Sequence, residues 1–139
     1  MTENDKNEML RVILCKPGET AEAVEIDDDL ESMQELVGGL IQEFMPFHSE
    51  TDPRHDDVAI ICNEEGKING LELNRALRDE SGKVYDILAG TFLIVGLAKE
   101  GFASLSTKHQ EKYYKLFEYP EIFLSVNGDI LAIRVEDKT

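Results

Sequence analysis

The sequence predicts an α+β fold, in which a mixed or antiparallel sheet carries two helices in the order ββαβββαββ. Short apolar runs separated by Gly, Pro and Asn turn signals indicate strands, and two longer segments with apolar residues at helical spacing indicate helices. These elements do not alternate as a βαβ chain would. With 139 residues, of which 42% are hydrophobic, the chain has the size of one domain. We therefore expect a flexible acidic lead at residues 1–8 and a single α+β domain at residues 9–139.

The first elements are predicted to be a hairpin and a helix. Residues 10–15 and 21–26 are strand-like, and Pro17-Gly18 between them suits the central positions of a type II turn. Asp28 followed by Glu31 has the spacing of a capping box. The apolar residues that follow recur at helical spacing, which predicts a helix over residues 29–44.

The middle of the chain is predicted to form three strands. Residues 58–62 are continuously apolar, as in a strand at the centre of a sheet. A short strand is expected over residues 73–77. Residues 84–96 are expected to form one long strand that bends at Ala89-Gly90.

The last part of the chain is predicted to be a helix followed by a hairpin. Ser106 or Thr107 caps a helix that runs to Glu118, and a proline follows its end. Residues 122–126 and 130–135 then pair around Asn127-Gly128, a favoured hairpin turn.

Charge is the outlying property of the composition. The chain has 29 acidic and 14 basic residues, a net charge of −15, and residues 1–50 alone carry 13 acids against 3 bases. Such a surface repels nucleic acid and anionic lipid, so we expect no direct nucleic-acid or membrane binding. The amino-terminal segment is polar and acidic rather than signal-like. The longest apolar run is too short to span a bilayer, and we expect a cytoplasmic protein.

The only two cysteines, Cys15 and Cys62, lie within strand-like apolar runs. For a chain without an export signal we interpret them as reduced, buried thiols. The polar stretch from His48 to Asp57 has metal-capable atoms but no metal-ligand spacing, and no catalytic or nucleotide-binding motif occurs. We therefore predict no metal, no cofactor and no catalytic residue, so an enzyme is the less favoured interpretation.

Two groups of polar residues are candidates for binding. Arg75 and Arg78 could hold an anion by bidentate hydrogen bonds, although pairing with nearby acids, with Asn63 and Asn69 setting turns, is the favoured interpretation. The candidate ligand or partner patch comprises Asn63, Asn69, Asn74, Arg75, Arg78, Asp79, Tyr85 and Asp86. The candidate acidic face comprises Glu19, Glu22, Glu25, Asp27, Asp28, Glu31 and Glu35.

Three motifs are familiar from other sequences: DDDLESMQELVGG at residues 27–39, ICNEEGKINGLELNRALRD at residues 61–79 and YDILAGTFLIVG at residues 85–96. Together they resemble a family of small bacterial proteins, found in gut Firmicutes, plasmids and phage, that is known as a domain of unknown function. The resemblance covers roughly residues 10–126 and implies a mobile-element setting without a characterised activity. The loop at residues 45–55 departs from the family pattern.

Two functional hypotheses follow. The first is a non-enzymatic accessory protein that binds another protein, in its sharper form an acidic inhibitor or DNA mimic. The alternative is a small-molecule or nucleotide sensor, or a degenerate enzyme, with its site around Arg75 and Arg78. Convergence of Asn74, Arg75, Arg78 and Asp86 in one pocket would favour the second. A homodimer through the edge strands of either terminal hairpin is an open alternative.

Overall fold

The structure is a computed structural model that describes residues 9–46 and 57–136. Its centre is an antiparallel sheet in the order β2-β1-β7-β4-β3, and β8 pairs with the end of β7. Two further two-stranded sheets are formed by β5 with β6 and by β9 with β10. The elements are β1 (Met9–Cys15), β2 (Glu22–Asp27), α1 (Leu30–Val37), β3 (Ile41–Phe44), β4 (Val58–Asn63), β5 (Leu73–Arg78), β6 (Val84–Ala89), β7 (Phe92–Ala98), β8 (Gly101–Ala103), α2 (Thr107–Phe117), β9 (Glu121–Val126) and β10 (Asp129–Arg134).

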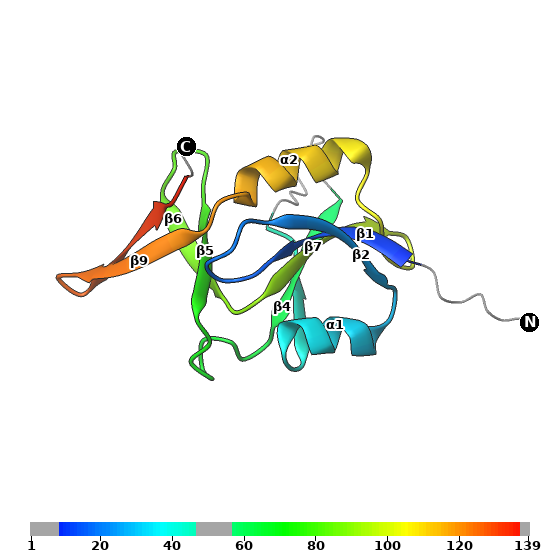
Figure 1. The fold of residues 1–139 in the computed structure, drawn as a ribbon, viewed down its shortest axis with the longest axis horizontal. Coiled ribbons are helices and arrows are strands. Elements are labelled where there is room, and N and C mark those ends of the chain that lie inside the picture. Colours follow the sequence, from blue (N-terminus) through cyan, green and yellow to red (C-terminus); the bar gives the residue numbers. More distant parts are fainter. Residues whose placement is uncertain (1–8, 47–56, 137–139) are drawn as a thin grey trace, which may run out of the picture.

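Both faces of the central sheet are covered, so its inner strands are apolar on both sides (Figure 1). On one face, α1 contributes Met33 to a cluster with alternate residues of β1, β4 and β7. On the other face, α2 contributes Tyr113 and Phe117, and the β5–β6 pair contributes Leu77 and Leu88. All six residues of β4 are buried, which explains the continuous apolar run. The predicted α+β class is therefore confirmed.

The two predicted hairpins are present at the expected places. Gly18 has a φ of 76°, and Glu19 N donates to Lys16 O at 3.1 Å, as a type II turn requires. At the other end of the chain, Asn127 and Gly128 both have positive φ, at 52° and 86°. This backbone conformation favours a tight two-residue turn between β9 and β10.

The first helix is shorter than predicted and begins one residue later than the capping box suggested. Asp29, not Asp28, is the N-cap, and its side chain accepts from Ser32 N at 2.7 Å. Gly38 has a left-handed φ of 82° and ends the helix. The chain then continues as β3, so Ile41 lies on a strand although its spacing from α1 suggested helix. The predicted end at residue 44 was wrong because a glycine pair permits the chain to turn.

The segment expected to be one bent strand is two strands in different sheets. Gly90, with a φ of 81°, lies between β6 and β7, so the chain leaves the β5–β6 pair there and enters the central sheet. The short strand β8 was not predicted. Six strands, β3 to β8, therefore lie between the helices, where the sequence indicated three.

Of the two predicted capping residues, Ser106 is the N-cap of α2 and accepts from His109 N at 3.1 Å, and Thr107 is the first residue of the helix. After α2 the β9–β10 hairpin extends away from the rest of the molecule, at the end opposite the amino terminus (Figure 1). The predicted acidic lead at residues 1–8 and most of the loop at residues 45–55 lie outside the described residues. In the part of the chain that is described, no helix is long and apolar enough to cross a membrane.

Candidate functional site

Asn74 and Arg75 are completely buried, although they are consecutive residues of a strand. Successive side chains of a regular strand point to opposite faces. Here the pairing of β5 with β6 shifts register between Leu73 and Arg75, so Asn74 is an extra residue. This bulge accounts for two neighbouring polar side chains that both lie in the interior.

Asn74 joins three segments through its amide group. Its Nδ2 donates to Cys15 O at 3.0 Å and to Gly90 O at 2.8 Å, while its Oδ1 accepts from Arg75 Nη1 at 2.8 Å. Cys15 ends β1, and Gly90 lies between β6 and β7. The side chain therefore donates to one carbonyl at the end of β1 and to another between β6 and β7.

Arg75 holds the end of α2. Its Nε donates to Phe117 O at 3.0 Å, and its Nη2 donates to Glu19 O at 2.7 Å and to Glu118 O at 3.5 Å. The last carbonyls of a helix lack partners within the helix and carry partial negative charge. Within the described residues, the hydrogen bonds of this guanidinium go to these backbone carbonyls and to Asn74 Oδ1 rather than to an acid, contrary to the pairing expected from sequence. We call Asn74 and Arg75 with these carbonyls the polar clamp.

Arg78 does pair with an acid, as expected, but it anchors the C-terminal hairpin. Its two terminal nitrogens lie 2.8 and 3.1 Å from the carboxylate oxygens of Glu121, the first residue of β9. The Glu121 side chain is only 3% exposed, and its Oε2 also accepts from Ala76 N at 3.3 Å. Such a bidentate, largely buried pair fixes geometry at the root of the hairpin.

Three other residues of the candidate patch serve turns or lie on the surface. Asp79 Oδ1 accepts from Ser81 and from Lys83 N, and these hydrogen bonds lower the pKa of its carboxyl group. Asn69 and Tyr85 are exposed.

Asn63 does set a turn, as predicted. Its Oδ1 accepts from Glu65 N at 2.8 Å, and its Nδ2 donates to Val37 O at 3.1 Å. The same side chain thereby links the end of β4 to the end of α1.

Asp86 lines a separate cavity of about 440 Å³ between β3, the loop after β4, and β6. Its Oδ1 accepts from Lys67 Nζ at 2.6 Å. Asn63 and Cys62 also line this cavity, whereas Asn74, Arg75 and Arg78 do not. The four residues whose convergence would have favoured a ligand site therefore lie in three places.

Both cysteines are free and buried, as predicted. Burial raises the pKa of the Cys15 thiol to about 12, although nearby Arg75 opposes this shift. Burial, followed by the negative charge of Asp86, raises the pKa of Cys62 as well. A thiol whose pKa is raised is neutral at physiological pH and is a poor nucleophile.

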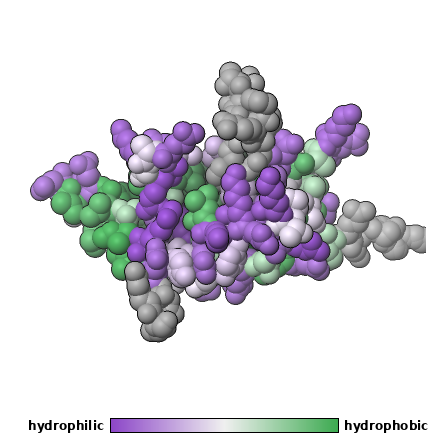
Figure 2. Space-filling view, turned by 90° about the horizontal axis from the view of Figure 1, so that it is seen from above, coloured by the Kyte–Doolittle hydropathy of each residue, from purple (hydrophilic) through white to green (hydrophobic). Residues whose placement is uncertain are grey.

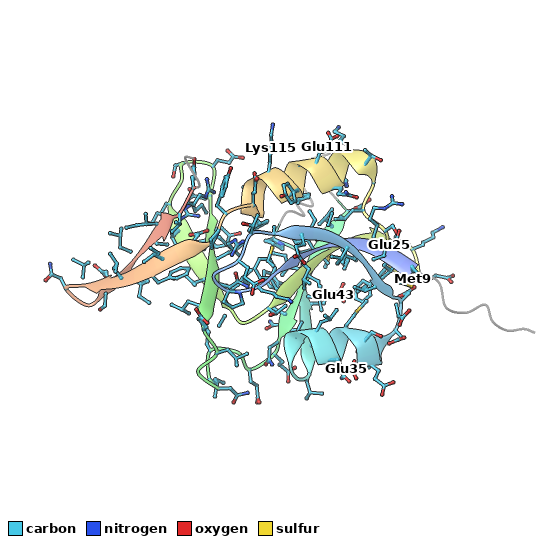
Figure 3. All side chains as sticks on the ribbon, in the orientation of Figure 1. Met9, Glu25, Glu35, Glu43, Glu111 and Lys115 are labelled. Carbon is cyan, nitrogen blue, oxygen red and sulfur yellow. The ribbon has the colours of Figure 1, made fainter. Side chains whose placement is uncertain are left out.

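The residues of the candidate acidic face come from consecutive segments between the β1–β2 turn and α1. Glu22, Glu25 and Asp27 belong to β2, Glu31 and Glu35 belong to α1, and Asp28 precedes that helix. Glu19 lies in the turn between β1 and β2, where its backbone carbonyl belongs to the polar clamp. Figure 3 shows Glu35 on the side of α1 away from the sheet and Glu25 beside β2. The acids are therefore spread over the β1–β2 turn, β2 and α1.

The β9–β10 hairpin presents an apolar surface that the sequence analysis did not identify. Cross-strand pairs Ile122–Ile133 and Leu124–Leu131 lie in register on one face, and Val126 and Val135 extend it by alternation. We call these six residues the hairpin face; their exposed fractions lie between 41% and 51%. Figure 2 shows apolar surface gathered at this end of the molecule. The apolar residues that recur at every second position on both sides of Asn127-Gly128 are the sequence signal from which this surface could have been predicted.

The opposite face of the hairpin turns toward the body near its root, where Glu121 is buried and Phe123 and Ala132 are partly buried. Toward the tip this opposite face is also exposed, and Ile130, paired with Ser125, is 52% exposed. Among residues 9–46 and 57–136, no group of His, Cys, Asp and Glu is arranged to hold a metal ion.

Comparison with known proteins places the chain in a family. The model of a family described as "Domain of unknown function (DUF3846)" matches residues 10–118. The match begins where the motif resemblance began and ends eight residues earlier than the resemblance indicated. The β9–β10 hairpin follows the matched region. No curated protein and no solved structure matches the chain.

Proposed function

We propose that this chain, which belongs to the DUF3846 family of unknown function, is a non-enzymatic protein-interaction module. The observation that carries the proposal is the hairpin face, because six aliphatic side chains are exposed together on a projecting two-stranded sheet. Contiguous apolar patches of several hundred Å² on a protein surface mark interaction sites. The mobile-element setting implied by the motifs remains part of the proposal and determines where partners are sought.

The hydrogen bonds that the candidate ligand residues make within the protein support this proposal. Asn74 Nδ2 and the three guanidinium nitrogens of Arg75 all donate to protein oxygens. Arg78 is engaged by Glu121. An anion at these arginines would therefore compete with buried hydrogen bonds.

The acidic inhibitor or DNA mimic is a narrower form of the same proposal. Charged groups on β2 and α1 would then steer a basic partner, with association that weakens as salt rises. The distribution of these acids over the β1–β2 turn, β2 and α1 favours general electrostatic repulsion and solubility over a shaped imitation of a phosphate backbone. The apolar hairpin face remains the stronger candidate for contact.

The test compares tagged variants with the wild type as baits, in host lysate and in cells that also express an untagged copy of the chain. Leu131→Lys places a charge at the centre of the hairpin face, whereas Ile130→Lys places one on the opposite face at similar exposure. We expect proteins captured by the wild type at low and high salt to be lost with Leu131→Lys and retained with Ile130→Lys. Identical capture by all three baits would overturn the proposal.

A second candidate function is small-molecule binding at the cavity between β3 and β6. Its volume of about 440 Å³ is within the range of small-molecule sites. Glu64, Glu65 and Asp86 outnumber Lys67 in its lining, so a neutral or cationic compound suits it better than a nucleotide. Stabilisation against heat by such compounds, absent in a Gln42→Trp variant that fills the cavity, would support this function. No shift with any compound would argue against it.

A further inference from the structure

We infer that the hairpin face is the contact surface of a homodimer, in which the same face of a second copy packs against it. This inference rests on the proposed function, because it names the partner of the same surface. The geometry is a two-fold arrangement with the Leu124–Leu131 pair of each copy near the axis. Such an interface is isologous, so one patch must be complementary to itself.

The chemistry of the hairpin face satisfies this requirement. All six side chains are branched aliphatics, and Leu124 and Leu131 lie directly opposite each other in the middle. The six side chains carry no charge and no hydrogen-bonding group that would specify a polar partner. On the same side of the hairpin, Asp129 lies opposite Val126 at the tip, away from the Leu124–Leu131 pair. Two faces of this kind pack together as the inner faces of two stacked sheets do.

The distribution of charge favours contact at this end of the molecule. Each copy carries −15, and residues 1–50 contribute 13 acids against 3 bases, whereas residues 101–139 contribute 6 acids against 5 bases. Joining copies through β2 or α1 would bring the densest negative charge together. Joining them through β9–β10 leaves the amino-terminal ends pointing apart, because the hairpin projects from the opposite end of the molecule (Figure 1).

The exposed area of the hairpin face sets the expected affinity of the dimer. Six aliphatic side chains that are about half exposed present on the order of 500 Å² per copy, so a face-to-face dimer buries roughly 1,000 Å², the lower limit for a specific interface. The hairpin also gains from being covered, because an isolated two-stranded sheet is only marginally stable in water. We therefore expect a concentration-dependent dimer with a Kd in the micromolar range, about the affinity of a small interface.

The experiment is sedimentation velocity on the full chain from about 1 to 200 μM, bracketing micromolar affinity, at low and high salt. We expect the wild type to pass from monomer to dimer and to associate at least as well at high salt, because screening reduces repulsion between the acidic bodies. Leu131→Lys should remain monomeric throughout the range, and Ile130→Lys should associate like the wild type. A wild type that is monomeric at every concentration, or a dimer unaffected by Leu131→Lys, overturns the inference.

A cross-linking measurement distinguishes loss of the dimer contact from distortion of the hairpin by the substitution. Cys15 and Cys62 are buried, so a cysteine introduced on the hairpin is the accessible thiol in the described part of the chain. Mild oxidation should link Leu131→Cys chains into covalent dimers and leave Ile130→Cys chains unlinked. Equal linking of both variants overturns the two-fold geometry. A monomeric chain that still captures another protein through the hairpin face refutes the homodimer but not the interaction module.

Discussion

Replacing Arg75 by Met tests whether the central arginine is structural. Met has a comparable length and no hydrogen-bond donor, so Phe117 O, Glu19 O and Asn74 Oδ1 would lose donors now at 2.7–3.0 Å. Each such bond from a charged donor contributes about 1.5–3 kcal/mol. Removing the guanidinium also removes the cost of burying its charge, so the net loss should be about 4 kcal/mol rather than the sum.

Urea unfolding followed by circular dichroism measures this loss directly. A domain of this size has a free energy of unfolding of about 5–15 kcal/mol, so the variant should fold and show a clearly lower midpoint at an unchanged slope. Lys67→Met is the matched control, because it removes a cation whose ion pair with Asp86 is exposed. That variant should lose about 0–1 kcal/mol.

The two functional interpretations of Arg75 predict opposite results in this assay. An arginine kept for an anionic ligand is a liability in the unliganded fold, so its removal would be neutral or stabilising. A loss for Arg75→Met that is no larger than the loss for Lys67→Met would refute the polar clamp. Arg75→Lys should be intermediate, because an ammonium group cannot reproduce the planar fork of donors.

Three further predictions concern local structure. Asp29→Ala should lower the free energy of unfolding by about 1 kcal/mol, the usual cost of losing an N-cap, while Asp28→Ala should leave the urea midpoint unchanged. A larger loss for Asp28→Ala than for Asp29→Ala would show that Asp28 is the N-cap, as the sequence suggested. Gly96→Ala should cost about 1–3 kcal/mol, because a Cβ there would lie 2.7 Å from Ser104 O, and a wild-type melting temperature would contradict this crowding. Burial raises the pKa of Cys15 to about 12, so the stability that this thiol contributes is complete below the usual thiol pKa and is lost as pH rises toward 12. The free energy of unfolding should fall by up to about 1.4 kcal/mol per pH unit in that range. Urea titrations at pH 7, 9 and 10 should therefore show a shallower decline for Cys15→Ala than for the wild type.

Local signals in the sequence predicted the elements that depend on local chemistry. The turns at Gly18 and Asn127 and the cap at Ser106 were identified correctly because each requires a particular residue type at a particular position. The end of α1 was missed, since apolar spacing continues through Gly38 into β3 while the backbone changes conformation. The split between β6 and β7 was also missed, because Gly90 is compatible with a bend inside one strand or with passage between two sheets.

The candidate site was harder to predict because its partners come from distant segments. Arg75 contacts the β1–β2 turn and the end of α2, at separations of 56 and 42 residues. Its partners are backbone carbonyls, which every residue has, so no sequence pattern marks them. A buried arginine and a ligand-binding arginine therefore look alike in the sequence, and the burial and hydrogen bonds of Arg75 distinguish them in the structure.

The polar clamp also explains why the motif around these residues carries a family resemblance without indicating a ligand. The β5–β6 pair packs across three places where a regular element stops: the end of β1, the connection from β6 to β7, and the last turn of α2. Each leaves carbonyls that are buried and need donors. Asparagine and arginine supply several donors from adjacent positions, which a hydrophobic pair could not do. Because these residues hold the fold together, their presence says little about activity, and a search for function is better directed to the exposed surface of the β9–β10 hairpin.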